Sequence, residues 1–323
     1  MAKRYSNFDG LRGLATIAVI LIHITAPMHQ SGDLFLGLIN QACRFAVPVF
    51  LILSSWGLDH QDALDNSKNY LDFLKQRLTK LVPYYLVWSL IYLALNGYMT
   101  SWNFNLAGTL QALLLGQASY HLYFIPLIIG LYIFYPILSS LALNKLTFYT
   151  ITAIYLVQAI TDHIWGYNPY DLVQDYVSYT FCFLVGIRLS QDFASKKQQF
   201  QHYKSAIYGL VILTLVGLAG EYLLSQGTVI GATRPLMIAY AVSLVLLAMV
   251  VEWSKTDFLT YLSRYSYSIY LSHVFWLQLI EAIPGLNSLP FLLVFLIKLA
   301  LLSTGLWLTI SMDQILTSST KNQ

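Results

Sequence analysis

The stretch FDGLRGLATIAVILIHITAP, residues 8–27, decides the fold class. Its apolar part approaches the ~20 residues that a helix needs to cross a bilayer, and it carries few charges. Nine further apolar runs follow the first, which we place at roughly 10–28; the others lie at roughly 35–57, 81–100, 121–142, 147–165, 172–189, 205–224, 235–253, 263–283 and 290–311. The sequence therefore predicts an all-α, polytopic membrane helix bundle of about ten transmembrane helices. It also predicts one membrane-embedded domain, 1–323, without a separate soluble domain.

The composition excludes most other classes of protein. Hydrophobic residues make up 57% of the chain and charged residues only 10%, whereas soluble proteins carry about 25% charged residues. A mean hydropathy of +0.60 excludes a disordered chain, a coiled coil and a disulfide scaffold. Both cysteines, Cys43 and Cys182, lie in apolar runs, so we expect two free thiols. A net charge of +3 is too small to indicate nucleic acid as a partner.

The basic residues indicate the orientation. With the N-terminus inside, all but three of the 18 Lys and Arg residues fall at predicted cytoplasmic ends, and the exceptions are Arg44, Arg234 and Lys298. This is the positive-inside pattern, and it predicts that both termini are cytoplasmic. The positive-inside pattern holds only if the short apolar run 106–118 does not cross the membrane. We therefore expect that run to be a re-entrant or interfacial segment.

The first span carries two residues that suggest chemistry. Arg12 and His23 are eleven residues apart, which leaves them about 20° from alignment and ~16 Å apart along a helix. Arg12 at the cytoplasmic end could hold an anionic group, and His23 could move a proton near neutral pH. The alternative is an interfacial arginine and a histidine bonded to a carbonyl. Asp9, on the same face, either orients Arg12 or is an ordinary acidic residue at a helix start.

At this point the chain resembles acyltransferase family 3, a family of integral-membrane O-acyltransferases. The string F-D-G-L-R-G and the R-x10-H spacing carry the resemblance in the first span. Four further strings resemble family motifs in the same order along the chain: VPVFLILSS (47–55), RLTKLVPYY (77–85), HLYFIPLIIGLYIFYPIL (121–138) and SRYSYSIYLSH (263–273). Relatives usually have glycine, arginine and tryptophan where this chain has Ser55, Lys80 and Tyr123. Ser55 puts a close helix approach in doubt, and Lys80 loses bidentate phosphate binding.

The resemblance implies a function. Such enzymes move an acyl group, commonly acetyl from acetyl-CoA, to a hydroxyl of an extracytoplasmic or lipid-linked glycan. It implies a multi-pass protein of the cell membrane, with acyl-CoA as the donor substrate and no permanently bound cofactor. Many relatives add an extracytoplasmic esterase-like domain. This chain stops at Gln323, so we expect it to act alone or with a separate extracytoplasmic partner protein.

Each candidate residue has a role and an ordinary alternative. His23 is the expected general base, for direct transfer or through an acyl-histidine. Arg77 and Lys80 share a helix face with Lys75 close by, and all three would bind the phosphates of acyl-CoA, although topology alone also places cations there. No metal-binding motif is present.

Arg44 lies inside the second span, where a charge is expensive. It would stabilise the oxyanion of acyl transfer or bind an acidic acceptor. Its alternative is a structural ion pair with Asp175, Glu221 or Glu281. The remaining candidates for the substrate pocket have helix contacts or interfacial positions as their alternatives; they are His121, Tyr123, Tyr267, Tyr270, His273 and Ser54.

Two other functions compete with the enzyme. A transporter of a glycan, lipid or small anion could use Arg12, His23 and Arg44 along its path. The sequence shows no inverted repeat, which argues against a transporter. The early helices are also expected to be unbroken, although Pro48 weakens that point. An inactive family member that serves as a scaffold would explain the departures at Ser55, Lys80 and Tyr123.

Overall fold

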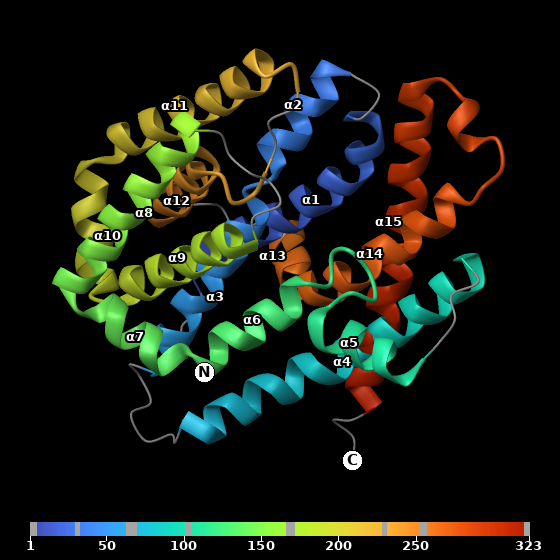
Figure 1. The fold of residues 1–323 in the computed structure, drawn as a ribbon, viewed down its shortest axis with the longest axis horizontal. Helices are drawn as coiled ribbons and strands as arrows, with labels where there is room; N and C mark the ends of the chain where they lie inside the picture. The colour runs from blue at the N-terminus through green and yellow to red at the C-terminus, as the bar shows by residue number, and fades with distance from the viewer. Residues whose placement is uncertain are drawn as a thin grey trace. The chain divides into compact units, whose positions relative to one another are not determined.

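The computed structural model describes residues 5–29, 33–62, 70–100, 105–165, 172–227, 231–251 and 257–319. The regular structure in these residues is helical, which confirms the all-α prediction (Figure 1). The predicted cytoplasmic termini lie outside the described residues. The helices are α1 (Ser6–His29), α2 (Leu34–Cys43), α3 (Ala46–Asp62), α4 (Tyr70–Thr100), α5 (Leu106–Leu115), α6 (Phe124–Ile133), α7 (Tyr135–Leu143), α8 (Lys145–Trp165), α9 (Leu172–Ser190), α10 (Phe193–His202), α11 (Lys204–Leu224), α12 (Pro235–Val250), α13 (Asp257–Arg264), α14 (Ser266–Glu281), the 3₁₀ turn η1 (Leu286–Ser288) and α15 (Phe291–Ser319).

The chain divides into two compact units. Unit 1 combines residues 1–64 with 137–266, and unit 2 combines residues 65–136 with 267–323. The candidate residues on α1 and α2 therefore belong to unit 1, and those on α4, α14 and the segment before α6 belong to unit 2. The single domain over 1–323 stays a prediction.

Several helices are long and apolar enough to cross a membrane. In the described part of the chain, five spans meet the criteria of length and composition: Ser6–Ala26, Leu34–Leu58, Tyr70–Gly97, Lys204–Leu224 and Leu292–Ile315. Helices α6 and α7 add a sixth if they form one broken span. The count of ten spans stays a prediction. The short run after residue 105 is a separate helix, α5, which ends at Gly116 in the left-handed conformation.

The second predicted span is interrupted between α2 and α3, at the proline that the expectation of unbroken early helices excepted. Helix α2 ends at Cys43 and α3 begins at Ala46. Pro48 explains the break, because its ring clashes with the carbonyl of Arg44 and it has no N–H to donate. Proline is tolerated where it stands, in the first turn of α3.

The fourth predicted span is broken in the same way. Helix α6 ends at Ile133, and Pro136 stands in the first turn of α7. A proline there prevents a helical bond to the carbonyl of Tyr132. In the structure the hydroxyl of Tyr70 donates to the carbonyl of Ile133 and lies 3.2 Å from the carbonyl of Tyr132. The tyrosine therefore places a donor at the backbone carbonyls beside the break.

Two other predicted boundaries are also wrong. Helix α4 begins at Tyr70, eleven residues before the predicted start at 81, because hydropathy marks only the apolar part of a helix whose first turns are polar. The predicted span 263–283 is divided at Tyr265 between α13 and α14. No proline or glycine marks this division in the sequence.

Helices α3 and α9 approach closely despite Ser55, so the doubt raised by that residue is resolved. The space is supplied by Gly186 on α9, where an added Cβ would lie 2.0 Å from Ser55 Oγ and 2.2 Å from the Ile52 carbonyl oxygen. Ser55 is buried, and its hydroxyl donates to that same carbonyl at 3.1 Å. The glycine that permits this contact is therefore on the partner helix α9, at position 186, and not at position 55.

Replacing Gly186 with alanine should therefore destabilise unit 1. The new methyl group meets a backbone carbonyl that cannot rotate away, and overpacking of this kind costs about 1–3 kcal/mol. Thermal unfolding of the detergent-purified protein measures the loss. Gly57→Ala is the matched control on α3, because an added Cβ there has nothing within 4 Å. Equal stability of the two variants would contradict the close contact.

Candidate functional site

Arg12 is held at the start of α1 by Asp9. The Arg12 Nη1 atom lies 3.8 Å from Asp9 Oδ1, and the Ser263 hydroxyl donates to the same oxygen at 3.3 Å. Asp9 is buried and also lies in the first turn of α1, so both sequence interpretations of it apply. Helix α13 brings Ser263 to this point because Gly13 lets it come close: an added Cβ would lie 2.3 Å from the Leu259 carbonyl oxygen.

His23 lies on the same stripe of α1 as Arg12. Helix α1 is continuous from Ser6 to His29, so the two side chains stay about 20° apart in direction and ~16 Å apart along the axis. Thr16 and Val19, which lie between them on the stripe, are buried. Arg12 and His23 themselves are partly exposed. The stripe thus has a buried middle and an accessible residue at each end.

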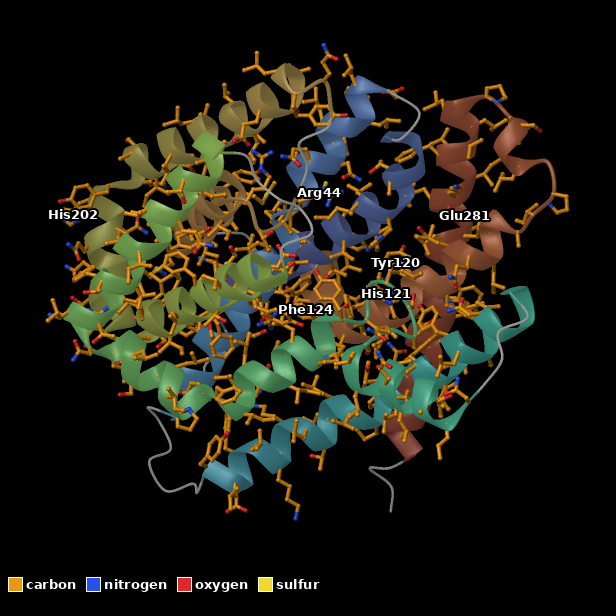
Figure 2. The ribbon with its side chains drawn as sticks, viewed as in Figure 1. Arg44, Tyr120, His121, Phe124, His202 and Glu281 are labelled. Atoms are coloured by element: carbon orange, nitrogen blue, oxygen red, sulfur yellow. The ribbon has the colours of Figure 1, made fainter. Side chains whose placement is uncertain are left out.

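Arg44, which is labelled in Figure 2, takes part in a polar network between α2 and α1. Its Nε donates to Asn40 Oδ1 at 3.0 Å. Asn40 Nδ2 in turn donates to the Ile22 carbonyl at 2.8 Å and to Thr25 Oγ1 at 2.9 Å. Thr25 lies about 160° around α1 from His23. This network therefore holds α2 against the side of α1 that faces away from the Arg12–His23 stripe.

The acidic residues considered as partners of Arg44 all contact other residues. Asp175 accepts from the Thr233 hydroxyl at 2.6 Å. Glu221 pairs with Arg234 at 3.0 Å, and Glu281 pairs with Lys298 at 3.1 Å. The two other basic residues of the apolar runs are thus ion-paired within their own units. Ser54, the remaining candidate of unit 1, is half-buried in α3.

In unit 2, the structure brings His121 and His273 together. Their ring centroids are 5.0 Å apart in an edge-to-face arrangement, and both side chains are buried. Tyr92 packs edge-on against His121 at 5.2 Å. The Tyr270 hydroxyl donates to the His121 carbonyl. Figure 2 shows His121 beside Tyr120 on the segment between α5 and α6.

The hydrogen bonds of His273 define its neutral form. Its Nδ1 faces the carbonyl of Tyr270 at 2.7 Å and that of Ile269 at 3.2 Å. A carbonyl oxygen only accepts, so neutral His273 carries its proton on Nδ1 and has a lone pair on Nε2. His121 Nδ1 lies 3.1 Å from the Ser119 hydroxyl, which can donate or accept. His273 Nε2 can therefore accept a hydrogen bond, and the Ser119 contact is compatible with either neutral tautomer of His121.

Tyr267, Tyr270 and His273 lie on α14 and contact two different neighbours. The Tyr267 hydroxyl donates to the Leu81 carbonyl of α4 at 2.7 Å, and the other two residues contact His121. Tyr123, in contrast, is exposed. These contacts support the helix-packing alternative for Tyr267 and place Tyr270 beside the histidine pair.

The basic residues of α4 share one continuous helix. Arg77 lies over the ring of Phe73, 5.7 Å from its centroid. Lys75 and Lys80 are exposed. Two cations accessible from one helix end can attract phosphate. Within the described ranges, no group of His, Cys, Asp or Glu side chains is arranged to hold a metal ion.

Sequence reasoning missed four residues that order these groups. Asn40 and Thr25 connect α2 to α1, and Ser119 and Tyr92 surround His121. Asn40 carried a detectable signal, because an amide inside an apolar run is costly unless it is bonded. Tyr92 carried none, since it is one of 24 tyrosines.

Comparisons with known proteins identify the family. A serine/alanine racemase of Enterococcus gallinarum is 29% identical over 192 residues, which cover 56% of this chain. The match spans only 26% of that protein's length. No solved structure matches significantly. The family model described as "Acyltransferase domain" matches residues 5–312. This match and the long apolar helices show that the chain belongs to acyltransferase family 3, a family of multi-pass membrane proteins.

Proposed function

We propose that the protein is a membrane O-acyltransferase. It moves an acyl group, acetyl by preference, from acyl-CoA to a hydroxyl of an extracytoplasmic or lipid-linked glycan at the cell membrane. The observation that carries the proposal is the stripe of α1, where Asp9 holds Arg12 and the same uninterrupted helix presents His23. Family membership supports the transferase chemistry.

His23 acts as the general base. It accepts the proton of the acceptor hydroxyl while the oxygen attacks the thioester carbonyl carbon. The carbon–sulfur bond then breaks, CoA leaves as the thiolate, and the proton passes from His23 to the sulfur. Arg12 binds an anionic group of the donor, and Asp9 and Ser263 hold Arg12 in place. Transfer is direct, without an acyl-histidine.

Arg77 and Lys80 bind phosphates of the donor. Arg77→Ala should raise the KM for acyl-CoA about tenfold with little change in kcat, because one charge-assisted contact is worth roughly 1.5 kcal/mol or more. Lys80→Arg should lower that KM, because guanidinium binds phosphate with two hydrogen bonds. Steady-state kinetics with varied donor measure both effects. Lys145→Ala, which removes an exposed cation at the start of α8, is the control for general charge. A fall in kcat alone for Arg77→Ala would contradict donor binding.

The activity itself is tested with purified protein and acyl-CoA. Release of free CoA that depends on an added glycan acceptor supports the enzyme. Uptake of labelled glycan into vesicles without CoA release would favour a transporter instead. Mass analysis of surface polysaccharides with and without the gene would identify the acyl group, since each acylated hydroxyl of the glycan adds one acyl mass.

A further inference from the structure

A hollow of about 250 Å³ lies between α2 and α11 in unit 1. It is lined by Phe35, Leu38, Ile39, Gln41, Ala42, Leu215, Leu218 and Ala219. Both helices belong to apolar segments long enough to cross a membrane. Phe35 at the rim is 70% exposed. The hollow therefore opens on a surface that lipid chains would cover.

The two helices make one close contact beside the hollow and line it partly with small side chains. The contact is at Gly37, where an added Cβ would lie 1.5 Å from the Tyr222 hydroxyl oxygen. The lining side chains include Ala42 and Ala219. An alanine side chain fills little of the space between two packed helices. Along α2, the Gly37–Tyr222 contact lies between the lining residues Phe35 and Leu38.

Gln41 is the polar residue of this apolar wall, and it is only 1% exposed. Among the residues that the structure describes, neither its Nε2 nor its Oε1 has a hydrogen-bond partner. Its neighbour Asn40, in contrast, is bonded to Arg44, Ile22 and Thr25. A buried amide without partners is unfavourable. An alkyl chain in the hollow would leave the Gln41 amide without hydrogen bonds. A water molecule there would find too few polar partners to be stable.

We propose that this hollow binds a membrane lipid whose backbone carries a free hydroxyl beside an ester, as a diacylglycerol does. When the lipid binds, the amide of Gln41, whose polar atoms are closed off in the structure, turns toward the hollow. The lipid hydroxyl then donates to Gln41 Oε1, and the ester carbonyl accepts from Gln41 Nε2. Gln41 lies seven residues after Leu34, ~10 Å along α2. The volume accommodates the lipid backbone and the beginning of one chain, but no large headgroup. This site is separate from the Arg12–His23 stripe and does not depend on the proposed acyl transfer.

The experiment uses the full chain in nanodiscs of phosphatidylcholine with a photoreactive diacylglycerol as the probe. After irradiation, peptide mass spectrometry should find the label on α2 and α11. Gln41→Leu keeps the size of the side chain and removes both polar atoms, so labelling there should fall at least tenfold. Ala219→Phe fills the hollow and should have the same effect. Val216→Phe, on an exposed part of α11 outside the hollow, is the matched control and should label normally.

A photoreactive phosphatidylcholine, which has esters but no hydroxyl, is the second probe. It should label the hollow weakly and equally in wild type and Gln41→Leu. Size-exclusion profiles confirm that each variant is folded, and Gln41→Leu should be at least as stable as wild type in lipid-free detergent because it removes an unsatisfied amide. Unchanged diacylglycerol labelling in both Gln41→Leu and Ala219→Phe would overturn the proposal. So would equal, Gln41-independent labelling by the two lipids.

Discussion

Replacing His23 with alanine is expected to abolish acyl transfer while the protein still folds. General-base catalysis contributes about 10²–10⁴-fold to rate, and the residues between Arg12 and His23 on the stripe, Thr16 and Val19, carry no basic group. His23 is partly exposed, so its loss should cost little stability. The measurement is acceptor-dependent release of CoA from acyl-CoA by purified variants, with the thermal midpoint recorded in parallel.

His202→Ala is the matched control for this prediction. His202 is exposed on α10, and its Nδ1 lies 3.1 Å from the Gln198 carbonyl of the same helix. That variant should keep wild-type activity. A near-normal rate in His23→Ala would end the proposed mechanism. Intact mass measured after adding donor without acceptor tests direct transfer, since an acyl-histidine would add one acyl mass to wild type but not to His23→Ala.

The largest loss of stability is expected on breaking the Arg234–Glu221 pair. The two groups lie 3.0 Å apart, with side chains 9% and 21% exposed. Removing one partner of a buried ion pair costs about 3–5 kcal/mol, because the remaining charge stays desolvated. Glu221→Ala should therefore lower the free energy of unfolding by about that amount. Denaturant or thermal unfolding in detergent provides the measurement.

Two further variants separate charge from packing. Arg234→Met combined with Glu221→Ala should recover most of the loss, because no charge is then left without its partner. Lys298→Met at the Glu281 pair should cost less, since the Glu281 carboxylate that is left behind is 40% exposed and remains partly solvated. Equal losses at the two pairs, or a double variant no better than Glu221→Ala, would show that burial of the charge is not the cause.

The sequence predicted what depends on composition and helical spacing. The all-α class follows from apolar runs, and the alignment of Arg12 with His23 needs only a continuous helix, which α1 provides. The family was recognised from ordered motifs, and the match to residues 5–312 confirms it. The adjacency of Asp9 and Arg12 also followed from spacing alone.

Features that depend on a partner helix could not be predicted in the same way. Ser55 suggested a loose contact, yet Gly186, more than a hundred residues later, supplies the missing space. The contact of His121 with His273 joins segments equally distant in the chain. The break before Ala46 was different, because Pro48 is a local signal that hydropathy averages do not register.

The division of the chain into two units has a consequence for synthesis. Apart from Ser266, every residue of unit 1 precedes α14, whereas unit 2 needs α14 and α15, which are synthesised after unit 1. Because compact units tend to fold as they emerge, unit 1 can mature while α4 to α6 still wait for their C-terminal partners. His121 would then meet His273 only after unit 1 has been synthesised, so termination before α14 would spare the arginine–histidine stripe and lose the histidine pair.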